Sequence, residues 1–284
     1  MRALAQRIAS RLAEIEGVRA VVLGGSWARG AAGPDSDLDL GIYYQPSAPP
    51  SVRELRRIAA ELDPHAGAAQ VTDFGAWGPW VNGGAWLDIE GRPVDWLYRD
   101  LDKVDQVIDD CIAGRPTCDY YLGHPHGFQN HVYLAEVHHC QSLYDPYGTV
   151  QTLKSRVTPY PPALRQALIE KYLFDAAFML DLARKPARRG DVFHVAGCLF
   201  RCAAALVQVL FALNERYFMN EKGAVAAIEA FPRHPPSFAA RVGAILGNPG
   251  PDAASLYRSV AEMDGVLTET RGLAPPLRYS WFGR

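Results

Sequence analysis

Apolar side chains recur at helical spacing at the start of the chain and then give way to short β-rich runs. An amphipathic helix over residues 2–16 is predicted by apolar residues three or four positions apart, namely Leu4, Ile8, Leu12 and Ile15. Gly17 ends this helix, and residues 18–23 form an apolar run that predicts a strand stopping at Gly24. The chain therefore opens with a helix followed by a buried strand.

Alternating polar and apolar side chains over residues 37–43 predict a strand with Asp37 and Asp39 on one face. Similar patterns predict helices over 52–62 and 102–113 and strands over 85–90 and 93–98, the two strands being joined at Gly91-Arg92. Helices and strands are thus mixed in roughly the first 115 residues, without the strict alternation of a βαβ fold.

The pattern becomes helical from about residue 126. Helical periods fit residues 126–140, 162–185, 190–217, 222–231, 236–247 and 252–270, with proline and glycine between them. The sequence therefore predicts an α+β fold, with a small mixed β-sheet domain over 1–120 and an all-helical bundle over 121–284. The most apolar stretch, residues 195–213, contains Arg201 and Gln208 and is expected to be a buried helix rather than a membrane span.

Composition narrows the possible environments and partners. A hydrophobic content of 49% and a charged content of 21% are typical of a globular protein that buries a core. The net charge of −2 provides no basic field for a long polyanion, which argues against nucleic acid as a partner. The 5 cysteines have no C-x-x-C spacing and no secretory signal precedes them, so we expect reduced thiols in a cytoplasmic protein.

The stretch from Leu23 to Leu40 concentrates the candidate chemistry. Two glycines allow the backbone to approach a ligand closely, and Ser26 is expected to cap a short helix whose start suits a phosphate. Arg29, one turn further, is positioned to bind the same phosphates. Asp37 and Asp39, side by side on the next strand, are a carboxylate pair suited to Mg²⁺.

These motifs carry a resemblance to a known family. G-S-W-A-R-G followed by S-D-L-D-L resembles the DNA polymerase beta-like nucleotidyltransferase superfamily, in its two-domain type similar to kanamycin nucleotidyltransferase. The resemblance implies an NTP donor, ATP in the first instance, and two Mg²⁺ ions as cofactors. It assigns triphosphate contacts to Gly25 and Ser26 and metal ligation to Asp37 and Asp39, and it places Arg29 where polymerase beta has a phosphate-contacting arginine.

The same family has a third carboxylate on a later strand. Asp95, between apolar neighbours in the strand predicted over 93–98, fits best, and Asp88 is the rival. A carboxylate flanked by apolar residues is unfavourable unless it is paired or binds a metal. The alternative is that neither aspartate is a ligand and that Asp95 pairs with Arg92 or Arg99.

The middle of the chain is rich in histidine and contains a candidate general base. Of the 8 histidines, 5 lie between residues 124 and 139, and zinc binding, substrate contact and structural roles are all open for them. In small-molecule members of the family a glutamate from the early helical domain deprotonates the acceptor hydroxyl, and Glu136 is the residue that resemblance suggests. The alternative is a surface or paired carboxylate.

A second, weaker motif lies in the helical half. Arg189 and His194 have the spacing R-x4-H, which resembles the motif of HEPN-type ribonucleases. The alternative is that Arg189 and Asp191 cap a helix or line the cleft that faces the sheet.

We therefore predict an Mg²⁺-dependent nucleotidyltransferase that moves a nucleoside monophosphate to a hydroxyl of a small molecule such as an antibiotic. The alternatives are a protein hydroxyl, as in an AMPylating toxin–antitoxin system, an RNA 3′ end, and a non-catalytic NTP-binding regulator. Homodimerisation is left open, and no membrane partner is expected.

Overall fold

The computed structural model describes residues 1–65, 67, 70–120 and 123–276. Two compact units divide the chain, and each is built from two separate segments. The sheet unit comprises Met1–Asp110 and Tyr133–Pro159, and the helical unit comprises Cys111–Val132 and the chain from Tyr160 onward. The domain boundary expected at residue 120 lies within the first segment of the helical unit. The division into domains over 1–120 and 121–284 stays a prediction.

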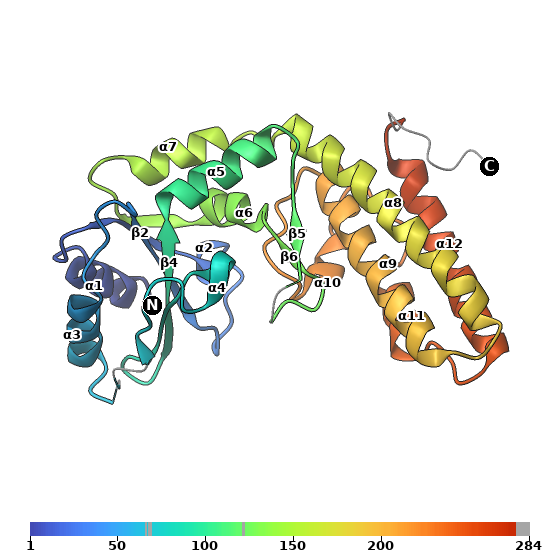
Figure 1. Cartoon of the computed structure of the whole chain (residues 1–284), viewed down its shortest axis with the longest axis horizontal. Coiled ribbons are helices and arrows are strands. Elements are labelled where there is room, and N and C mark those ends of the chain that lie inside the picture. Colours follow the sequence, from blue (N-terminus) through green and yellow to red (C-terminus); the bar gives the residue numbers. More distant parts are fainter. Residues whose placement is uncertain (66, 68–69, 121–122, 277–284) are drawn as a thin grey trace. The chain divides into compact units, whose positions relative to one another are not determined.

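A mixed five-stranded sheet forms the centre of the sheet unit (Figure 1). The strands lie in the order β3-β4-β2-β1-β7. Their bounds are β1 Val18–Leu23, β2 Leu38–Tyr44, β3 Gly84–Asp88, β4 Pro93–Asp100 and β7 Gln141–Tyr144. β2 and β4 are parallel, whereas the other neighbours are antiparallel. The predicted α+β fold class is confirmed.

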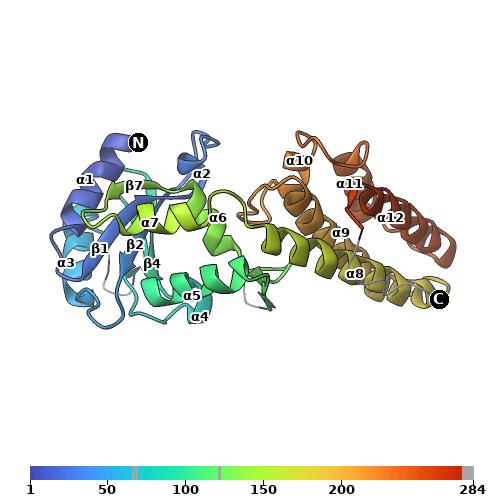
Figure 2. The same ribbon diagram turned by 90° about the horizontal axis from the view of Figure 1, so that it is seen from above.

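The helices of the sheet unit cover the sheet unequally. Their bounds are α1 Arg2–Leu12, α2 Gly25–Ala28, α3 Val52–Leu62, α4 Gly78–Val81, α5 Leu101–Ile112, α6 Val132–His139 and α7 Thr149–Arg156. α1 and α3 lie together against one face, where they bury the apolar residues of β1, β2, β3 and β4 (Figure 2). The alternate residues of these strands point to the opposite face, which carries the candidate site.

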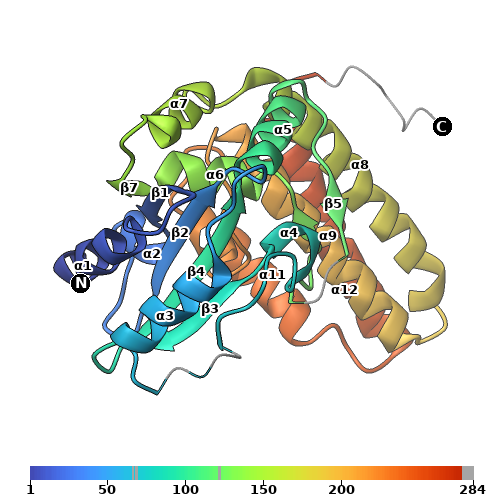
Figure 3. The same ribbon diagram turned by 60° about the vertical axis from the view of Figure 1, so that its left-hand side comes forward.

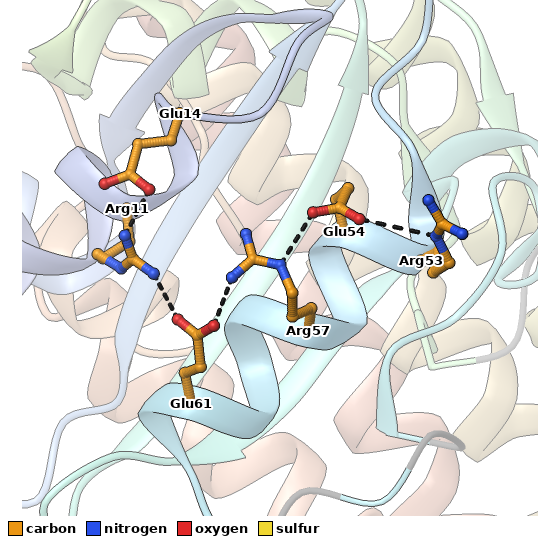
Figure 4. Close-up of polar contacts among 6 residues, drawn as sticks. All are labelled: Arg11, Glu14, Arg53, Glu54, Arg57 and Glu61. Atoms are coloured by element: carbon orange, nitrogen blue, oxygen red, sulfur yellow. Dashed lines mark hydrogen bonds and ion pairs between the residues drawn. The ribbon is translucent and has the colours of Figure 1, made fainter.

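Charged side chains join α1 to α3 on the solvent side of this core (Figure 4). Glu61 of α3 accepts hydrogen bonds from Arg11 of α1 and from Arg57 of its own helix. Arg57 also donates to Glu54 at 2.9 Å, and Arg11 pairs with Glu14. The hydrogen bond from Arg11 is the main cause that lowers the pKa of Glu61. These side chains are exposed, so the network orients the two helices and contributes little free energy per pair.

Several parts of the chain differ from the sequence-based expectation. The helix expected over 126–140 begins only at Val132, because Gly127 turns the chain at a φ of +82° and residues 128–129 form a strand instead. β7 and α7 were not predicted, although β7 is an edge strand of the main sheet. Ser26 lies inside α2 rather than at its N-cap, which is Gly24.

The helical unit consists of helices and one short hairpin. The hairpin strands are β5 Cys118–Asp119 and β6 Phe128–Gln129, and the helices are α8 Pro162–Ala187, α9 Val192–Leu213, α10 Ala224–Ile228, α11 Phe238–Gly247 and α12 Ala253–Leu273. α8, α9 and α12 pack against one another, and Figure 3 shows α8 beside α12. Among the described helices α9 is long and apolar enough to cross a membrane, but 78% of its apolar stretch is buried in the protein.

The core of the helical unit contains a neutral histidine. His131 is 1% exposed, and burial lowers its pKa to about 4, while the neighbouring Gln208 amide acts in the opposite direction. The folded protein therefore keeps this imidazole neutral at a pH where an unfolded chain would already bind a proton.

We predict that the free energy of unfolding falls as the pH drops from 6.5 towards 4, because the unfolded state protonates His131 first. At pH 5 this residue alone accounts for a loss of about 2 kcal/mol relative to pH 7. His131→Gln should remove that part of the pH dependence in urea unfolding at the two pH values. An equal loss in the variant and the wild type would contradict the assignment.

Candidate functional site

Two carboxylates meet on the open face of the sheet. The parallel register of β2 and β4 sets Asp39 directly opposite Asp95. Both side chains are half-buried, whereas the flanking Leu38 and Leu40 are fully buried on the other face. Because alternate residues of a strand face opposite sides, burial of the leucines in the core places the aspartates on the open face.

The glycine turn after β1 touches the first of these carboxylates. The Gly24 amide donates a hydrogen bond to the Asp39 carbonyl at 2.8 Å. Gly25 has a φ of +57°, and a Cβ atom at this position would lie 1.7 Å from Asp39 Oδ2. Only glycine therefore permits both this backbone conformation and the close approach of the carboxylate.

Two side-chain hydrogen bonds join the short helix α2, which follows the turn, to other segments. Trp27 Nε1 donates to the Ser36 carbonyl at 3.4 Å, and Gln141 Nε2 donates to the Ala28 carbonyl at 3.2 Å. The Ser26 hydroxyl has no hydrogen-bond partner within the described part of the chain. Arg29 is exposed, with Nε donating to the Gly25 carbonyl at 3.4 Å. The turn thus presents one hydroxyl and one guanidinium beside Asp39.

α6 lies over another part of the same sheet face. Glu136 accepts two hydrogen bonds from Arg99 of β4, both at 2.7 Å, and Arg99 is only 6% exposed. Burial lowers the pKa of Arg99, but the Glu136 carboxylate outweighs this and raises it above its ordinary value. Arg99 lies four residues beyond Asp95, a distance of about 13 Å along a strand.

The end of α6 returns to the glycine turn. Burial lowers the pKa of His139 to about 4, and the positive charge of Arg29 is among the further causes that lower it. His139 is therefore neutral at neutral pH and close to Arg29. The sequence alone does not link this histidine to the turn, since the link depends on β7 pairing with β1.

Tryptophans border the carboxylates on their other side. Trp86 of β3 is in register with Asp95 and is 59% exposed. It stacks on Trp77, with ring centroids 4.4 Å apart and an interplanar angle of 20°. Gly84 makes room for this stack, because a Cβ there would lie 3.1 Å from the Trp77 ring and 1.7 Å from a backbone oxygen of β4.

Part of this site lies in residues that match a known protein family. Residues 5–69 match the family model described as a nucleotidyltransferase domain, and the matched stretch includes the glycine turn and Asp39. The chain carries a nucleotidyltransferase domain. Asp95 and Trp86 lie outside the matched residues, so their place in the site comes from the strand register of the structure.

Other comparisons add less. Residues 129–222 match a domain of unknown function, DUF4037, and no curated protein matches the chain. A nucleotidyltransferase-like protein from Exiguobacterium sibiricum 255-15 is 11% identical with a TM-score of 0.47, over 96% of this chain and 78% of that one. A CdnC:HORMA-deltaN complex from E. coli MS115-1 gives 17% identity and a TM-score of 0.25, over 96% and 83%. These two likenesses carry no argument about function.

The structure brings some of the expected residues together and separates others. Gly25, Ser26, Asp39 and Asp95 lie around one point of the nucleotidyltransferase domain and its sheet. Asp37 is exposed and immediately precedes β2, and the rival Asp88 is exposed at the end of β3.

Glu136, the predicted general base, and Arg92, the alternative partner of Asp95, both have partners elsewhere. Glu136 binds Arg99, and Arg92 Nη1 donates to the Pro34 carbonyl at 2.9 Å.

The carboxylates around this point suit a hard divalent cation. Among the described residues no group of three or more His, Cys, Asp or Glu side chains is already gathered as a metal site. Asp39 and Asp95 nevertheless face each other across neighbouring strands, and Gly25 packs against Asp39. Carboxylate oxygens are the ligands that Mg²⁺ prefers. The residues present therefore fit Mg²⁺.

The histidines and the R-x4-H motif lie in different surroundings. His124 lies 3.6 Å from Glu221, His126 packs edge-on against Phe200, and His138 contacts Thr158 at 3.1 Å. Asp191 caps α9 by accepting a hydrogen bond from the His194 amide at 3.1 Å, as the sequence suggested.

We predict that Gly25→Ala weakens MgATP binding at least about 30-fold, because the new methyl group displaces the Asp39 carboxylate. Gly30→Ala is the matched control, since Gly30 also has a positive φ, of +68°, but a Cβ atom there would meet no other atom within 4 Å. Calorimetric titration with MgATP measures both. Similar affinities for the two variants would show that strain alone, rather than the contact with Asp39, matters at residue 25.

Proposed function

We propose that the protein transfers a nucleoside monophosphate, AMP from ATP in the first instance, to a hydroxyl group of a small molecule. In this reaction the acceptor oxygen forms a bond to the α-phosphorus, the bond to the β-phosphate oxygen breaks, and pyrophosphate leaves. The observation that carries the proposal is the pairing of Asp39 with Asp95 beside the Gly25-Ser26 turn.

The glycine turn is the proposed site of the triphosphate. Backbone amides at Gly25 and the unpaired hydroxyl of Ser26 provide hydrogen-bond donors, and Arg29 adds a positive charge from one turn further along. Neutral His139 lies near Arg29, so it adds no positive charge and is available to contact the same anion. The close contact between Gly25 and Asp39 holds this turn beside the carboxylates.

Asp37, Asp39 and Asp95 are the proposed ligands of two Mg²⁺ ions. When bound, the ions neutralise charge on the phosphates and increase the acidity of the acceptor hydroxyl. The protein's own contribution is the rigid placement of Asp39 and Asp95 by the sheet, while Asp37 joins them from the segment that leads into β2. Such placement before the reaction lowers the reorganisation needed in the transition state.

The order of groups across the sheet indicates where the acceptor binds. The glycine turn follows β1, and Asp39, Asp95 and Trp86 follow on β2, β4 and β3. Neighbouring strands are about 4.8 Å apart, so the carboxylates lie between the turn and the tryptophan stack. If the triphosphate occupies the turn, the acceptor approaches from the side of Trp86, whose exposed ring suits a flat sugar or aromatic face.

The acceptor proton passes to water or to Glu136. Both oxygens of Glu136 accept hydrogen bonds from Arg99, and Arg99 is about 13 Å from Asp95 along β4. Glu136 would have to leave this ion pair to reach the acceptor. We therefore favour water as the base and assign to Glu136 the task of holding α6 on the sheet.

The proposed setting is the cytoplasm. No disulfide joins the five cysteines, all of which belong to the described residues.

We predict that Asp39→Asn and Asp95→Asn each lower pyrophosphate release at least about 100-fold, since each removes a charge from the proposed metal site. The assay uses ATP, Mg²⁺ and a library of hydroxyl-bearing small molecules. Asp88→Asn is the matched control, because Asp88 is exposed on the neighbouring strand, and it should keep wild-type activity.

Labelled ATP added to cell extract identifies the acceptor class, with products separated by size. Label in small molecules supports the proposal. Label confined to protein would instead identify a protein-modifying enzyme, and label on RNA a terminal transferase. Full activity of Asp39→Asn would refute the proposed chemistry itself.

Glu136→Gln tests the choice of base. We expect turnover within about 3-fold of wild type and an unchanged pH profile, together with a loss of about 2 kcal/mol in stability, because Arg99 keeps its buried charge without a charged partner. Turnover and urea unfolding measure the two effects. A fall of about 100-fold in turnover with unchanged stability would identify Glu136 as the base.

A further inference from the structure

The helical hairpin of α8 and α9 carries apolar side chains that the fold leaves uncovered. The two helices pack along each other and are joined by a turn at one end of the helical unit (Figure 1). Phe193, the second residue of α9, is 92% exposed, and its neighbour Val192 is exposed as well. Phe178 and Leu182, four residues apart on α8, are also exposed. These four side chains contribute little to the core of the unit.

The exposed apolar residues of α8 form a second stripe on that helix. Its buried side chains include Ala176, Leu180 and Ala183, which belong to the surface that packs in the helical unit. With 3.6 residues per turn, Phe178 and Leu182 lie on the opposite side of the helix. A surface helix ordinarily combines one apolar stripe with a polar face. The second stripe therefore indicates a contact with a partner outside the described chain.

Three cationic side chains lie at the same end of the hairpin. Lys185 and Arg189 continue the stripe of Phe178 and Leu182 at helical spacing, and Arg188 precedes Arg189. All three cations are exposed, and none forms an ion pair within the part of the chain that the structure describes. The whole chain has a net charge of −2, so the turn is a local concentration of positive charge.

The carboxylates near the turn have other partners. Asp181 pairs with Arg184 at 3.3 Å. Asp191 and Asp252 each accept a hydrogen bond from a backbone amide, at 3.1 Å and 2.9 Å, and thereby cap α9 and α12. The three cations therefore remain available to a partner that carries negative charge.

We propose that the end of this hairpin binds the surface of an anionic lipid bilayer. The binding surface, called the hairpin tip below, consists of Leu182, Lys185, Arg188, Arg189, Val192 and Phe193. Its cations contact lipid phosphates, and Phe193 enters the boundary between headgroups and acyl chains. A side chain exposed to this degree projects from the protein, and a fluid bilayer accepts such a projection without a preformed pocket. The aliphatic Leu182 and Val192 favour acyl chains over nucleobases, which stack on aromatic rings.

The proposed contact is peripheral and independent of the nucleotide chemistry of the sheet unit. α9 is mostly buried in the helical unit, and only its first two residues belong to the hairpin tip. A spanning segment needs about 20 apolar residues exposed to lipid, whereas a peripheral contact needs only a few side chains at the surface. The tip also gives a role to the segment around Arg189 and His194, which the proposed transfer reaction does not use.

Sedimentation of the full chain with lipid vesicles tests the inference. Vesicles of phosphatidylcholine alone are compared with vesicles that contain about 25% phosphatidylglycerol, whose anionic headgroups attract basic segments. We expect binding to the anionic vesicles to be at least about 10-fold stronger in about 0.1 M salt. Most of this difference should disappear in about 0.5 M salt, because salt screens exposed charges.

Variants separate the apolar contact from the charged one. Phe193→Ser should weaken binding to the anionic vesicles about 10-fold, because serine buries almost no apolar surface. Arg188→Gln together with Arg189→Gln should weaken it about 30-fold, since each basic residue near such a surface contributes about 5-fold. The matched controls are Tyr147→Ser and Arg53→Gln in the sheet unit, where the Tyr147 residue is 69% exposed and the Arg53 side chain 90%. Both controls should bind like the wild type.

Three results would overturn the inference. The first is equal binding, or none, to the two kinds of vesicle. The second is an equal loss of binding in Phe193→Ser and Tyr147→Ser. The third is binding to poly(U) without binding to vesicles, which would assign the hairpin tip to single-stranded nucleic acid. Every substituted side chain is exposed, and urea unfolding checks that each variant is folded before it is compared with the wild type.

Discussion

The parallel pairing of β2 with β4 is the constraint on which the candidate site depends. It sets Asp39 opposite Asp95 on the open face and, by the same alternation, places Leu38, Leu40 and Trp96 in the core. A shift of one residue in either strand would bury a carboxylate in that core and expose a large apolar side chain. Burying an unpaired carboxylate is strongly unfavourable, so the free energy of packing the core also fixes the geometry of the site.

Around this pair the chain brings together segments that are distant in sequence. Gly25 packs directly against Asp39 because it lacks a Cβ atom. Gln141, on an edge strand more than a hundred residues later, donates a hydrogen bond to α2. The Arg99–Glu136 ion pair fastens α6 to the sheet just before that strand begins. The return of residues 133–159 to the sheet unit is thus part of how the candidate site is built, and it explains why the compact units are not continuous in sequence.

The sequence predicted those parts of the structure that depend on local patterns. β1 and α3 have the predicted bounds, and Asp95, which the family resemblance suggested as a carboxylate on a later strand, lies in register with Asp39. β7 was missed because its four residues show no alternation and gain their strand conformation only by pairing with β1. The partner of Glu136 and the position of Trp86 were missed for the same reason, since both depend on which strands are neighbours.

The helical unit shows how polar side chains are satisfied within an apolar core. Ser259 and Thr270 of α12 are buried, and each donates to a backbone carbonyl, at 2.9 Å and 2.8 Å. Gln208 lies on α9, whose other residues from Cys202 to Leu213 are buried and apolar, and its side chain forms a hydrogen bond with the buried ring of His131. A leucine there would add apolar contacts but would leave the buried imidazole without this partner. Burial nevertheless has the larger effect on the pKa of His131 and lowers it, so the two side chains form a neutral pair within the core.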